Sequence, residues 1–481
     1  MEEAYDVIVA GGGIAGTLAA TAAAKGGAKT LLLDRNKREE VGKKTNWGWV
    51  CGDAVAKSHI DFIKEKLGIV LTEKELDLKV DGVYALSPDL QTKIMFEGEG
   101  YSLNRPALAR RLLEEAIKAG AEFREGYEVE GPIIGSDGKL EGVFGKDDKK
   151  QGFRIKGKIV IDALGMASTL RRRLPQNKYI EREISIEDIE STGRYILRFT
   201  PAEKDENFYD PHNALIHLNQ LWAPGGYGWV FPKSSNRVNI GIGVERRSLE
   251  KRNKALNSND TLHKLIDDYV ALNKVLSNTS IDTSDNNGKG YWSVSVRRHQ
   301  HSLVYANYMG AGDSMSMPNP LSAGGIGPAM IAGTLAGKIA AEAVAANNTS
   351  MEFLWKYNLE FNKEYGSKSG ALEVFRVYLQ SLNNDMLNYG MKHFITPEEA
   401  KTLAYGGAVP ELSVFKAAQK LISGIANMKA FKNLVFAVRK MKRLMELYAN
   451  YPASPNGFDA WNEAVKAEIE EVKKKFPVNP V

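Results

Sequence analysis

Two short apolar runs near the start of the chain flank a segment of small residues. Tyr5–Ala10 has the length and composition of a buried strand, and Ile14–Lys25 predicts a helix directly after it. The second run, Thr30–Leu33, predicts another strand. A strand, a helix and a strand in this order are typical of an α/β domain built around a buried sheet.

The stretch from residue 76 to residue 175 mixes helical and strand periods. Apolar residues recur every three to four positions in Asn104–Ala119, which predicts a helix. Alternating apolar and polar positions predict paired strands around Pro88–Asp89, and more strands follow the helix. These strands are Gly82–Ser87, Thr92–Phe96, strands within Ala121–Val143 that Ser136–Gly138 separates, and a buried parallel strand, Ile159–Ala163.

From residue 184 to residue 244 the pattern becomes all-β. Short apolar runs are separated by Asn, Gly and Pro, which is typical of an antiparallel sheet. Such a sheet, inserted into a nucleotide-binding fold, commonly walls off a substrate pocket. The predicted strands are Tyr195–Phe199, Ala214–Leu218, Tyr227–Phe231 and Arg237–Val244.

The last third of the chain returns to the first domain and then becomes helical. Val304–Met309 predicts one more buried strand, and Ile326–Ala346 predicts a long helix. Lys338 and Glu342 interrupt the apolar residues of that helix, so we expect a buried helix and not a membrane span. Beyond Ala346, apolar spacings of three and four residues indicate further helices.

Composition is that of an ordinary globular protein with several structural units. Of the 481 residues, 43% are hydrophobic and 26% are charged. The net charge of +5 does not indicate nucleic-acid binding, and it is compatible with a local basic patch that meets an anionic headgroup or membrane surface. Cys51 is the one cysteine, which excludes an intrachain disulfide and fits a reducing compartment. The acidic start MEEAYD does not resemble a cleavable signal, so we expect a cytoplasmic protein.

Three glycines follow the first predicted strand in the pattern G-x-G-x-x-G. Gly11, Gly13 and Gly16 let the chain turn, approach a pyrophosphate and pack on the sheet, while the next helix points its first N–H groups at the phosphates. Asp34 follows 34 − 16 = 18 residues later, where its carboxylate would accept from a ribose hydroxyl. The alternative is an ordinary strand–turn–helix. The complete order of strand, helix, strand and acid favours a dinucleotide site.

The segment from Gly310 to Gly327 resembles the second flavin signature of the para-hydroxybenzoate-hydroxylase-like FAD flavoproteins. It reads G-A-G-D, then N-P-L-S-A-G-G-I-G, then a helix of small residues. The resemblance implies that Asp313 holds the ribityl chain and that the helix start, Gly325, Ile326 and Gly327, faces the flavin pyrimidine. A helix N-terminus stabilises the anion that a reduced flavin carries. The alternative interpretation is a loop followed by a buried helix.

Other positions resemble the same family. Arg105 resembles the arginine that contacts the cofactor between its two halves, the alternative being a solvated arginine at a helix start. Ala15 and Val129 also correspond to cofactor-binding positions. The segment Ile161–Ser168 resembles the A-D-G-x-x-S pattern, but Leu164 replaces its acid, which argues against a hydroxylase that uses NADPH directly.

A sharper resemblance is to the geranylgeranyl reductases, above all to the archaeal branch that saturates the prenyl chains of membrane ether lipids. The segment Pro224–Pro232 reproduces their P-x-x-Y-x-W-x-F-P pattern, and the C-terminal Leu447–Pro452 extends the likeness over nearly the whole chain. Thr45–Trp49 departs from the family pattern. The resemblance implies a cysteine-bearing flavin loop whose cofactor contacts are Cys51, Gly52, Asp53 and Ala54.

The aromatic residues of this pattern have a direct physical interpretation. In a strand, Tyr227, Trp229 and Phe231 face one side and form an apolar wall suited to a long hydrocarbon. The alternative is ordinary sheet core, but the flanking Pro224 and Pro232 favour a substrate wall. An isolated alkene accepts hydride only after protonation, and aromatic faces stabilise a cation by about 2 kcal/mol in a dry site. We therefore expect Tyr227 and Trp229 to serve catalysis as well as substrate binding.

Two further features leave alternatives open. Cys51 would border the flavin, where a thiol donates a proton or tunes the redox state, and the alternative is an inert buried cysteine. Basic and apolar residues interleave in Lys429–Leu447, which suits an anionic membrane surface or a substrate phosphate. The commoner explanation is a helix docked on the protein with its basic face in water. Histidine spacing predicts no metal site.

Together these patterns predict an α/β (α+β) protein with a Rossmann-like FAD-binding domain, an inserted antiparallel sheet and a C-terminal helical domain. The resemblance implies saturation of isolated double bonds in geranylgeranyl chains of ether-lipid precursors or geranylgeranyl diphosphate. The electron donor would be a ferredoxin-like protein or NAD(P)H, and peripheral contact with the inner membrane face is compatible with this function. The alternatives are an FAD-dependent monooxygenase and a non-catalytic flavin-containing lipid carrier. The expected domains are FAD-binding (1–75, 104–175, 301–346), substrate sheet (76–103, 176–300) and helical (347–481).

Overall fold

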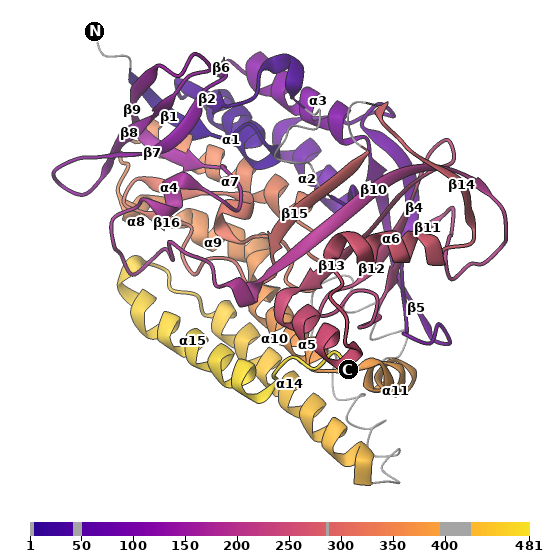
Figure 1. Cartoon of the computed structure of the whole chain (residues 1–481). Coiled ribbons are helices and arrows are strands. Elements are labelled where there is room, and N and C mark those ends of the chain that lie inside the picture. The colour runs from indigo at the N-terminus through magenta and orange to yellow at the C-terminus, as the bar shows by residue number, and fades with distance from the viewer. Residues whose placement is uncertain (1–3, 42–50, 285–287, 395–424) are drawn as a thin grey trace.

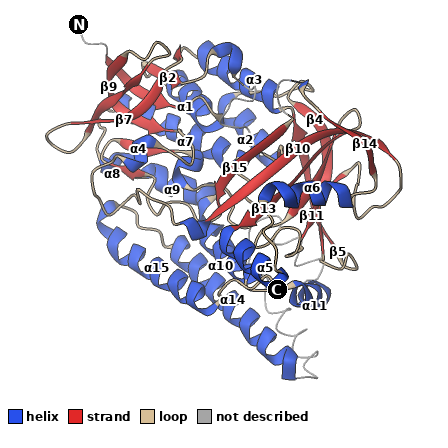
Figure 2. Cartoon of the chain, viewed as in Figure 1, coloured by secondary structure: helices blue, strands red, loops and turns tan. Residues whose placement is uncertain are grey.

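The computed structural model of the chain describes residues 4–41, 51–284, 288–394 and 425–481. Two sheets lie side by side, and the long C-terminal helices run along one edge of the molecule (Figure 1). Helices surround the first sheet, whereas long strands dominate the second (Figure 2). The predicted fold class, a Rossmann-like domain with an inserted sheet and a helical C-terminal part, is confirmed.

The first sheet has eight strands and a parallel centre. β1 (Ala4–Ala10) lies between β2 (Thr30–Asp34) and β9 (Gly152–Asp162) and is parallel to both. Helices cover both faces of such a sheet, which explains why its central strands are apolar along their length. The remaining strands are β6 (Glu122–Glu125), β7 (Glu128–Ile134), β8 (Leu140–Lys146), β16 (Val304–Tyr305) and β17 (Tyr308–Gly310).

The single strand predicted at Val304–Met309 is wrong. Ala306 has a φ of 49°, in the left-handed region, so the chain turns there. The residues before and after the turn form the antiparallel pair β16 and β17, with Val304 opposite Met309. Only β17 joins β9 in parallel.

Of the described helices that begin before residue 346, five accompany this sheet. α1 (Ile14–Lys25) has the predicted bounds and packs tightly against α7 (Ile326–Ala345). Asn104 caps the predicted helix α3 (Arg105–Lys118) by accepting from the Ala107 N–H at 3.2 Å. The other two are α2 (Lys57–Leu67) and α4 (Thr169–Arg172). Of the helices described, α7 included, none is long and apolar enough to cross a membrane.

The second sheet has nine strands and is mixed rather than purely antiparallel. β11 pairs antiparallel with β12 but parallel with β4, which corrects the expectation of a purely antiparallel sheet. No tight turn joins β4 to β11, so the direction of their pairing is not fixed by a hairpin. Its strands are β3 (Ala54–Ala56), β4 (Leu76–Leu86), β5 (Lys93–Leu103), β10 (Ile189–Pro201), β11 (Asn213–His217), β12 (Gly228–Lys233), β13 (Arg237–Glu245), β14 (Leu276–Ile281) and β15 (Lys289–Ser295).

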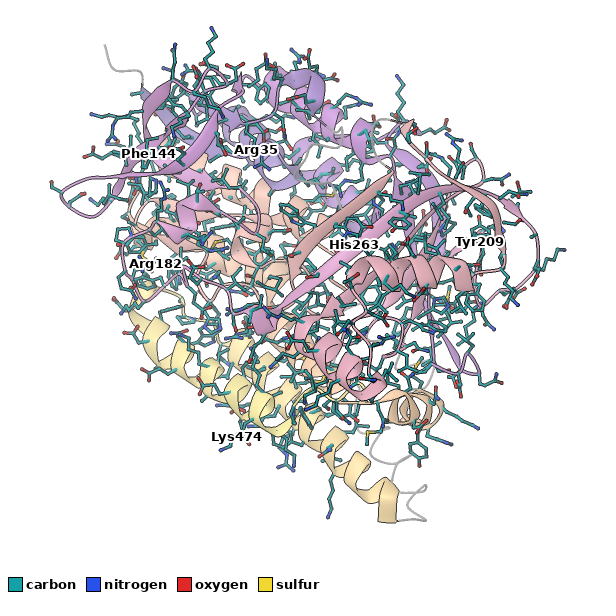
Figure 3. All side chains as sticks on the ribbon, in the orientation of Figure 1. Arg35, Phe144, Arg182, Tyr209, His263 and Lys474 are labelled. Atoms are coloured by element: carbon teal, nitrogen blue, oxygen red, sulfur yellow. The ribbon has the colours of Figure 1, made fainter. Side chains whose placement is uncertain are left out.

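Helices cover one side of the second sheet, which we call its outer face. α6 (Leu262–Leu272) lies over it, and the His263 ring stacks on Tyr291 of β15 with 4.0 Å between centroids (Figure 3). α5 (Arg246–Leu256) follows β13 directly. Apolar side chains of the middle strands fill the space under α6, among them Tyr195, Val230, Ile240 and Ile242. The opposite face is left for the functional site.

The C-terminal helices form a separate core. α14 (Ile425–Ala449) buries Leu434 and Leu444 against its neighbours, and Lys440 bonds Glu468 at 2.6 Å. The helix is therefore docked through its apolar side, as the commoner explanation of its pattern requires. The other helices of this core are α10 (Ser369–Gln380), α11 (Asn384–Phe394) and α15 (Phe458–Lys475). α8 (Met351–Leu354) and α9 (Lys356–Glu364) instead pack on the core of the first sheet through Leu354, Tyr357 and Phe361.

Candidate cofactor and substrate site

The glycine turn after β1 has no room for side chains at two of its positions. A Cβ on Gly16 would lie 1.7 Å from the Gly11 carbonyl oxygen, and one on Gly11 would lie 2.4 Å from the Ala163 oxygen. Gly11 also has a φ of 103°. Gly13, at the N-cap of α1, has open space around a built Cβ. The turn thus presents bare backbone and a helix N-terminus, the arrangement that fits a pyrophosphate.

Asp34 ends β2 beside this turn. Its carboxylate accepts from the Gly12 N–H at 2.6 Å and from the Asn36 N–H at 2.7 Å. Burial raises the pKa of Asp34, while these N–H donors act against the rise. The two bonds hold the carboxylate at the carboxyl end of the sheet, and the ribose contact stays a prediction.

Two other predicted cofactor positions lie in the walls of this region. Ala15 is buried in α1, close to α7. Val129 is buried in β7, and its carbonyl accepts from the Thr169 hydroxyl at 2.8 Å. A contact to the cofactor at either position stays a prediction.

The second flavin signature brings an acid next to the start of α7. A Cβ on Gly325, the N-cap of α7, would lie 3.3 Å from the Asp313 carboxylate. Burial raises the pKa of Asp313 and Arg105 opposes the rise. Ile326 is buried, and the Cα of Gly327 is covered by the His59 ring, 2.4 Å from a built Cβ. The acid, the arginine and the helix start therefore lie together, as the resemblance implies.

The cysteine loop lies against the same arginine. Arg105 donates to the Cys51 sulfur at 3.2 Å, and the Asp53 N–H lies 3.3 Å from it. Burial raises the pKa of the Cys51 thiol, with Arg105 opposing, so the thiol keeps its proton at neutral pH. Asp53 is fully buried with a φ of 61°, and Ala54 begins β3 at the surface. Residues 45–49, where the sequence departs from the family pattern, lie outside the described residues.

The expected row of rings is present on β12 and the residue before it. Neighbouring ring centroids are 6.1 Å apart for Tyr227 and Trp229 and 6.3 Å apart for Trp229 and Phe231. The Phe231 ring lies over Gly52, where a Cβ would be 2.6 Å from it. At the other end, the Tyr227 hydroxyl donates to the Ser322 carbonyl in the loop before α7. The row therefore connects the cysteine loop with the second flavin signature.

The two prolines of the pattern are structural neighbours of the row. Pro224 is buried, and its carbonyl accepts from the Glu245 N–H at 2.9 Å. Pro232 is buried within β12 opposite Val238. Direct substrate contact by either proline stays a prediction.

One residue that the sequence patterns did not single out holds these parts together. Asn239 is fully buried, and its amide oxygen accepts from the Trp229 indole N–H at 2.9 Å. Its amide nitrogen donates to the Cys51 carbonyl at 2.8 Å and to the Asp53 carboxylate at 3.0 Å. Lys233 lies 3.5 Å from that carboxylate. The sequence signal that could have revealed Asn239 is a polar residue in an apolar strand, on the same face as the glycines Gly241 and Gly243 because the three are spaced two residues apart.

The rings belong to one side of the sheet, which we call the inner face. Directly paired residues share a face, and Trp229 pairs with Gly241, which pairs with Arg194. A Cβ on Gly241 would lie 2.3 Å from the Trp229 ring. A Cβ on Gly243 would meet only Glu190 and Thr192 within 4 Å. The inner face is Tyr227, Trp229, Phe231, Asn239, Gly241, Gly243, Glu190, Thr192 and Arg194.

Comparison with known proteins agrees with this geometry. The geranylgeranyl reductase catalytic domain family matches residues 188–281, and the FAD-dependent oxidoreductase family matches residues 6–172. A digeranylgeranylglycerophospholipid reductase of Sulfolobus acidocaldarius is 33% identical over 98% of this chain and 99% of its own length. A geranylgeranyl bacteriochlorophyll reductase-like structure from Thermoplasma acidophilum has a TM-score of 0.71 at 26% identity, covering 88% of this chain and 100% of that one.

A more distant structure shares the fold alone. The myxobacterial chondrochloren halogenase, an FAD-dependent enzyme, has a TM-score of 0.64 at 17% identity over 93% of this chain and 97% of its own. The fold by itself therefore accommodates more than one flavin chemistry. The 33% identity along the full length of a reductase, together with the flavin signatures, decides in favour of the reductases over the halogenases. The chain belongs to the geranylgeranyl reductase family of FAD-dependent oxidoreductases.

Proposed function

We propose that this reductase saturates isolated double bonds of geranylgeranyl chains carried on a glycerophospholipid, and that the chains lie along the inner face. The observation that carries the proposal is the row of rings joining the Cys51 loop to the loop before α7. The relative with 33% identity is named for reduction of such a lipid. Geranylgeranyl diphosphate, which has the same chain on a different anionic head, is the second candidate substrate.

The proposed cofactor site uses the residues around α1 and α7. Gly11, Gly13 and Gly16 would take the pyrophosphate, and Asp34 would hold the ribose. The proposed flavin contacts come from the remaining residues: Cys51, Gly52, Asp53, Ala54, Arg105, Asp313, Gly325, Ile326 and Gly327. When bound in reduced form, FAD supplies a hydride.

The reaction requires a proton donor, stabilisation of a carbocation and exclusion of water. An isolated alkene has no carbonyl to take up charge, so a proton must reach one of its carbons before hydride reaches the other. The Tyr227 and Trp229 rings would stabilise the cation, and Asn239 fixes the Trp229 ring by its hydrogen bond. Cys51 carries a proton beside the proposed flavin site, where Arg105 orients the sulfur. Phe231 packs closely with Trp229 and over Gly52, which excludes water from this end of the ring row.

A redox partner must reduce the flavin between turnovers, and we propose a ferredoxin-like protein or NAD(P)H. Access to a lipid substrate is proposed to involve peripheral contact with the membrane. The exposed Lys432 and Arg439 of α14 suit an anionic surface. Binding to anionic vesicles, compared between wild type and Lys432→Glu, tests that contact.

Replacing Trp229 by leucine tests the proposed site. We expect FAD to remain bound and the rate of alkene reduction to fall at least tenfold, because about 2 kcal/mol of cation stabilisation is lost. The matched control is Trp222→Leu, because Trp222 packs against His217 and Tyr269 away from the inner face. The assay is anaerobic reoxidation of the dithionite-reduced holoenzyme by a geranylgeranyl lipid, with products identified by mass spectrometry.

The same assay separates the alternatives. A monooxygenase would need oxygen to turn over, and a lipid carrier would leave the reduced flavin unchanged. Turnover of Trp229→Leu at the wild-type rate would remove the proposed role of the ring. Cys51→Ser, measured in parallel, shows whether the thiol takes part in the reaction or only packs beside Arg105.

A further inference from the structure

Glu190 is a buried acid on the inner face to which the reaction above assigns no role. It lies on β10, is only 4% exposed, and its carboxylate oxygen lies 3.2 Å from a Cβ built on Gly243 and 3.4 Å from one on Gly226. Neither glycine has a side chain, so the carboxyl lies over bare backbone beside the Tyr227 end of the ring row. Burial raises the pKa of the Tyr227 hydroxyl and the charge of Glu190 adds to the rise, which places the two side chains close together.

On its other side, Glu190 contacts Gln380, whose side chain lines a solvent cavity. Gln380 of α10 donates to Glu190 at 3.4 Å and to the Gly225 carbonyl at 2.6 Å. Gln380 and Arg376 both line a cavity of about 520 Å³ between α5, α10 and the C-terminal segment. Lys473 lines it too, next to Lys474, which lies on the surface of α15 (Figure 3). Glu190 thus lies on the inner face, and the Gln380 side chain separates its carboxyl from the cavity.

We propose that Glu190 is the acid that brings protons from this cavity to the prenyl chain on the inner face. The inference rests on the proposed alkene reduction. The O–H bond of the Glu190 carboxyl breaks as a C–H bond forms on one alkene carbon, and the other carbon takes the hydride of reduced FAD. The alkene is reduced, the flavin is oxidised, and water from the cavity returns a proton to the carboxylate.

The charges around Glu190 support a carboxyl that is neutral before it reacts. Burial raises the pKa of Glu190 to about 7, Arg376 of α10 opposes the shift, and Glu245 of β13 adds to it. An acid whose pKa lies near the working pH both holds a proton and gives it up readily. The rate should therefore be highest below pH 7 and fall as the pH rises through about 7, because the deprotonated carboxylate cannot donate.

Glu190→Gln in the FAD-loaded enzyme is the test. It keeps the shape of a neutral carboxyl but has no acidic proton, so we expect FAD binding and dithionite reduction to be unchanged and alkene reduction to slow about a hundredfold or more. The fall in rate near pH 7 should disappear. The matched control is Glu187→Gln, which lines the same cavity but not the inner face and should behave as wild type.

Infrared spectroscopy provides a readout that does not depend on turnover. The difference spectrum of wild type minus Glu190→Gln should show a protonated-carboxyl band at low pH, and that band should vanish as the pH rises through about 7. If wild type reduces the lipid and Glu190→Gln matches its rate and pH profile, this inference is wrong and Cys51 becomes the acid to test. If wild type itself does not reduce the lipid, the proposed function fails instead. Gln380→Leu, which cuts the link to the cavity, should slow the reaction while the carboxyl band remains.

Discussion

The glycines around the first sheet and the glycines on the inner face of the second sheet face different partners. In the first region they let backbone approach backbone, as where a Cβ on Gly16 would lie 1.7 Å from the Gly11 oxygen and one on Gly333 would lie 2.2 Å from the Ala15 oxygen. In the second region they also make room for side chains. A Cβ on Gly241 would lie 2.3 Å from the Trp229 ring as well as 2.4 Å from the Gly193 carbonyl oxygen, and one on Gly52, in the loop before β3, would lie 2.6 Å from the Phe231 ring.

This difference separates cofactor binding from substrate chemistry. Backbone contacts cannot adjust, so substitution at the first kind of glycine should cost the fold or the cofactor. The Trp229 ring and the Glu190 carboxyl can shift, so substitution at Gly241 or Gly243 should leave FAD in place and change the reaction, with an added loss of stability at Gly241, where the methyl also meets backbone. Three substitutions test this division, in order of decreasing effect.

Gly16→Ala should have the largest effect. Its Cβ would overlap the Gly11 carbonyl oxygen, so we expect a loss of about 3 kcal/mol or more in the free energy of unfolding and a colourless protein.

Gly13→Ala is the matched control because its Cβ meets open space in front of α1. It should keep stability within about 0.5 kcal/mol and yet lower FAD affinity at least tenfold, by filling the place of the pyrophosphate. Thermal unfolding and flavin fluorescence titration measure both. Wild-type FAD affinity in Gly13→Ala would put the cofactor elsewhere.

Gly241→Ala should have an intermediate effect. The new methyl would lie 2.3 Å from the Trp229 ring and 2.4 Å from the Gly193 carbonyl oxygen, so β10 must shift and the ring must move and strain its hydrogen bond to Asn239. We expect lower stability, unchanged FAD affinity, a kcat about tenfold lower, and altered tryptophan fluorescence. Gly193→Ala, whose methyl would point at Tyr291 on the outer face, should lower stability but spare kcat. Equal kcat losses in both variants would contradict the assignment of the inner face to chemistry.

Gly243→Ala should have the smallest effect. Its methyl would lie 3.2 Å from the Glu190 carboxylate and 3.6 Å from Thr192, so stability should change by no more than about 0.5 kcal/mol. The methyl strips water from the carboxylate, which disfavours the charged form and raises the pKa of Glu190. The fall in rate near pH 7 should therefore move to higher pH. A shift to lower pH, or none, would show that Glu190 does not set the profile.

The sequence predicts the first region well because its signals are local. α1 has the predicted bounds, Ile14–Lys25, since a glycine turn and a run of small residues define a helix without reference to distant parts of the chain. The turn at Ala306 and the parallel pairing of β4 with β11 were missed. The β4–β11 pairing depends on how remote segments meet. The turn at Ala306 is local, but it rests on a positive φ that alanine rarely adopts, so no residue there signals it.

In the candidate site, too, the features carried by local patterns could be predicted and those that depend on long-range contacts could not. The ring row and the Cys51 loop could be named from patterns along the chain, but their meeting at Gly52 and Phe231 could not. Asn239 was missed because it bonds the carbonyl of a residue 188 positions away, and no short motif records such a contact. Glu190 was missed because only the pairing of β10 with β13 shows which face it occupies.

The most direct test of the division between a cofactor region and a substrate face is a single turnover without oxygen. Holoenzyme is reduced with dithionite, freed of excess reductant, and mixed with a geranylgeranyl glycerophospholipid, and the flavin spectrum and lipid masses are followed together. The account predicts that each flavin oxidised corresponds to one double bond saturated. A flavin that stays reduced beside an unchanged lipid, or that is oxidised only when air is admitted, would contradict it.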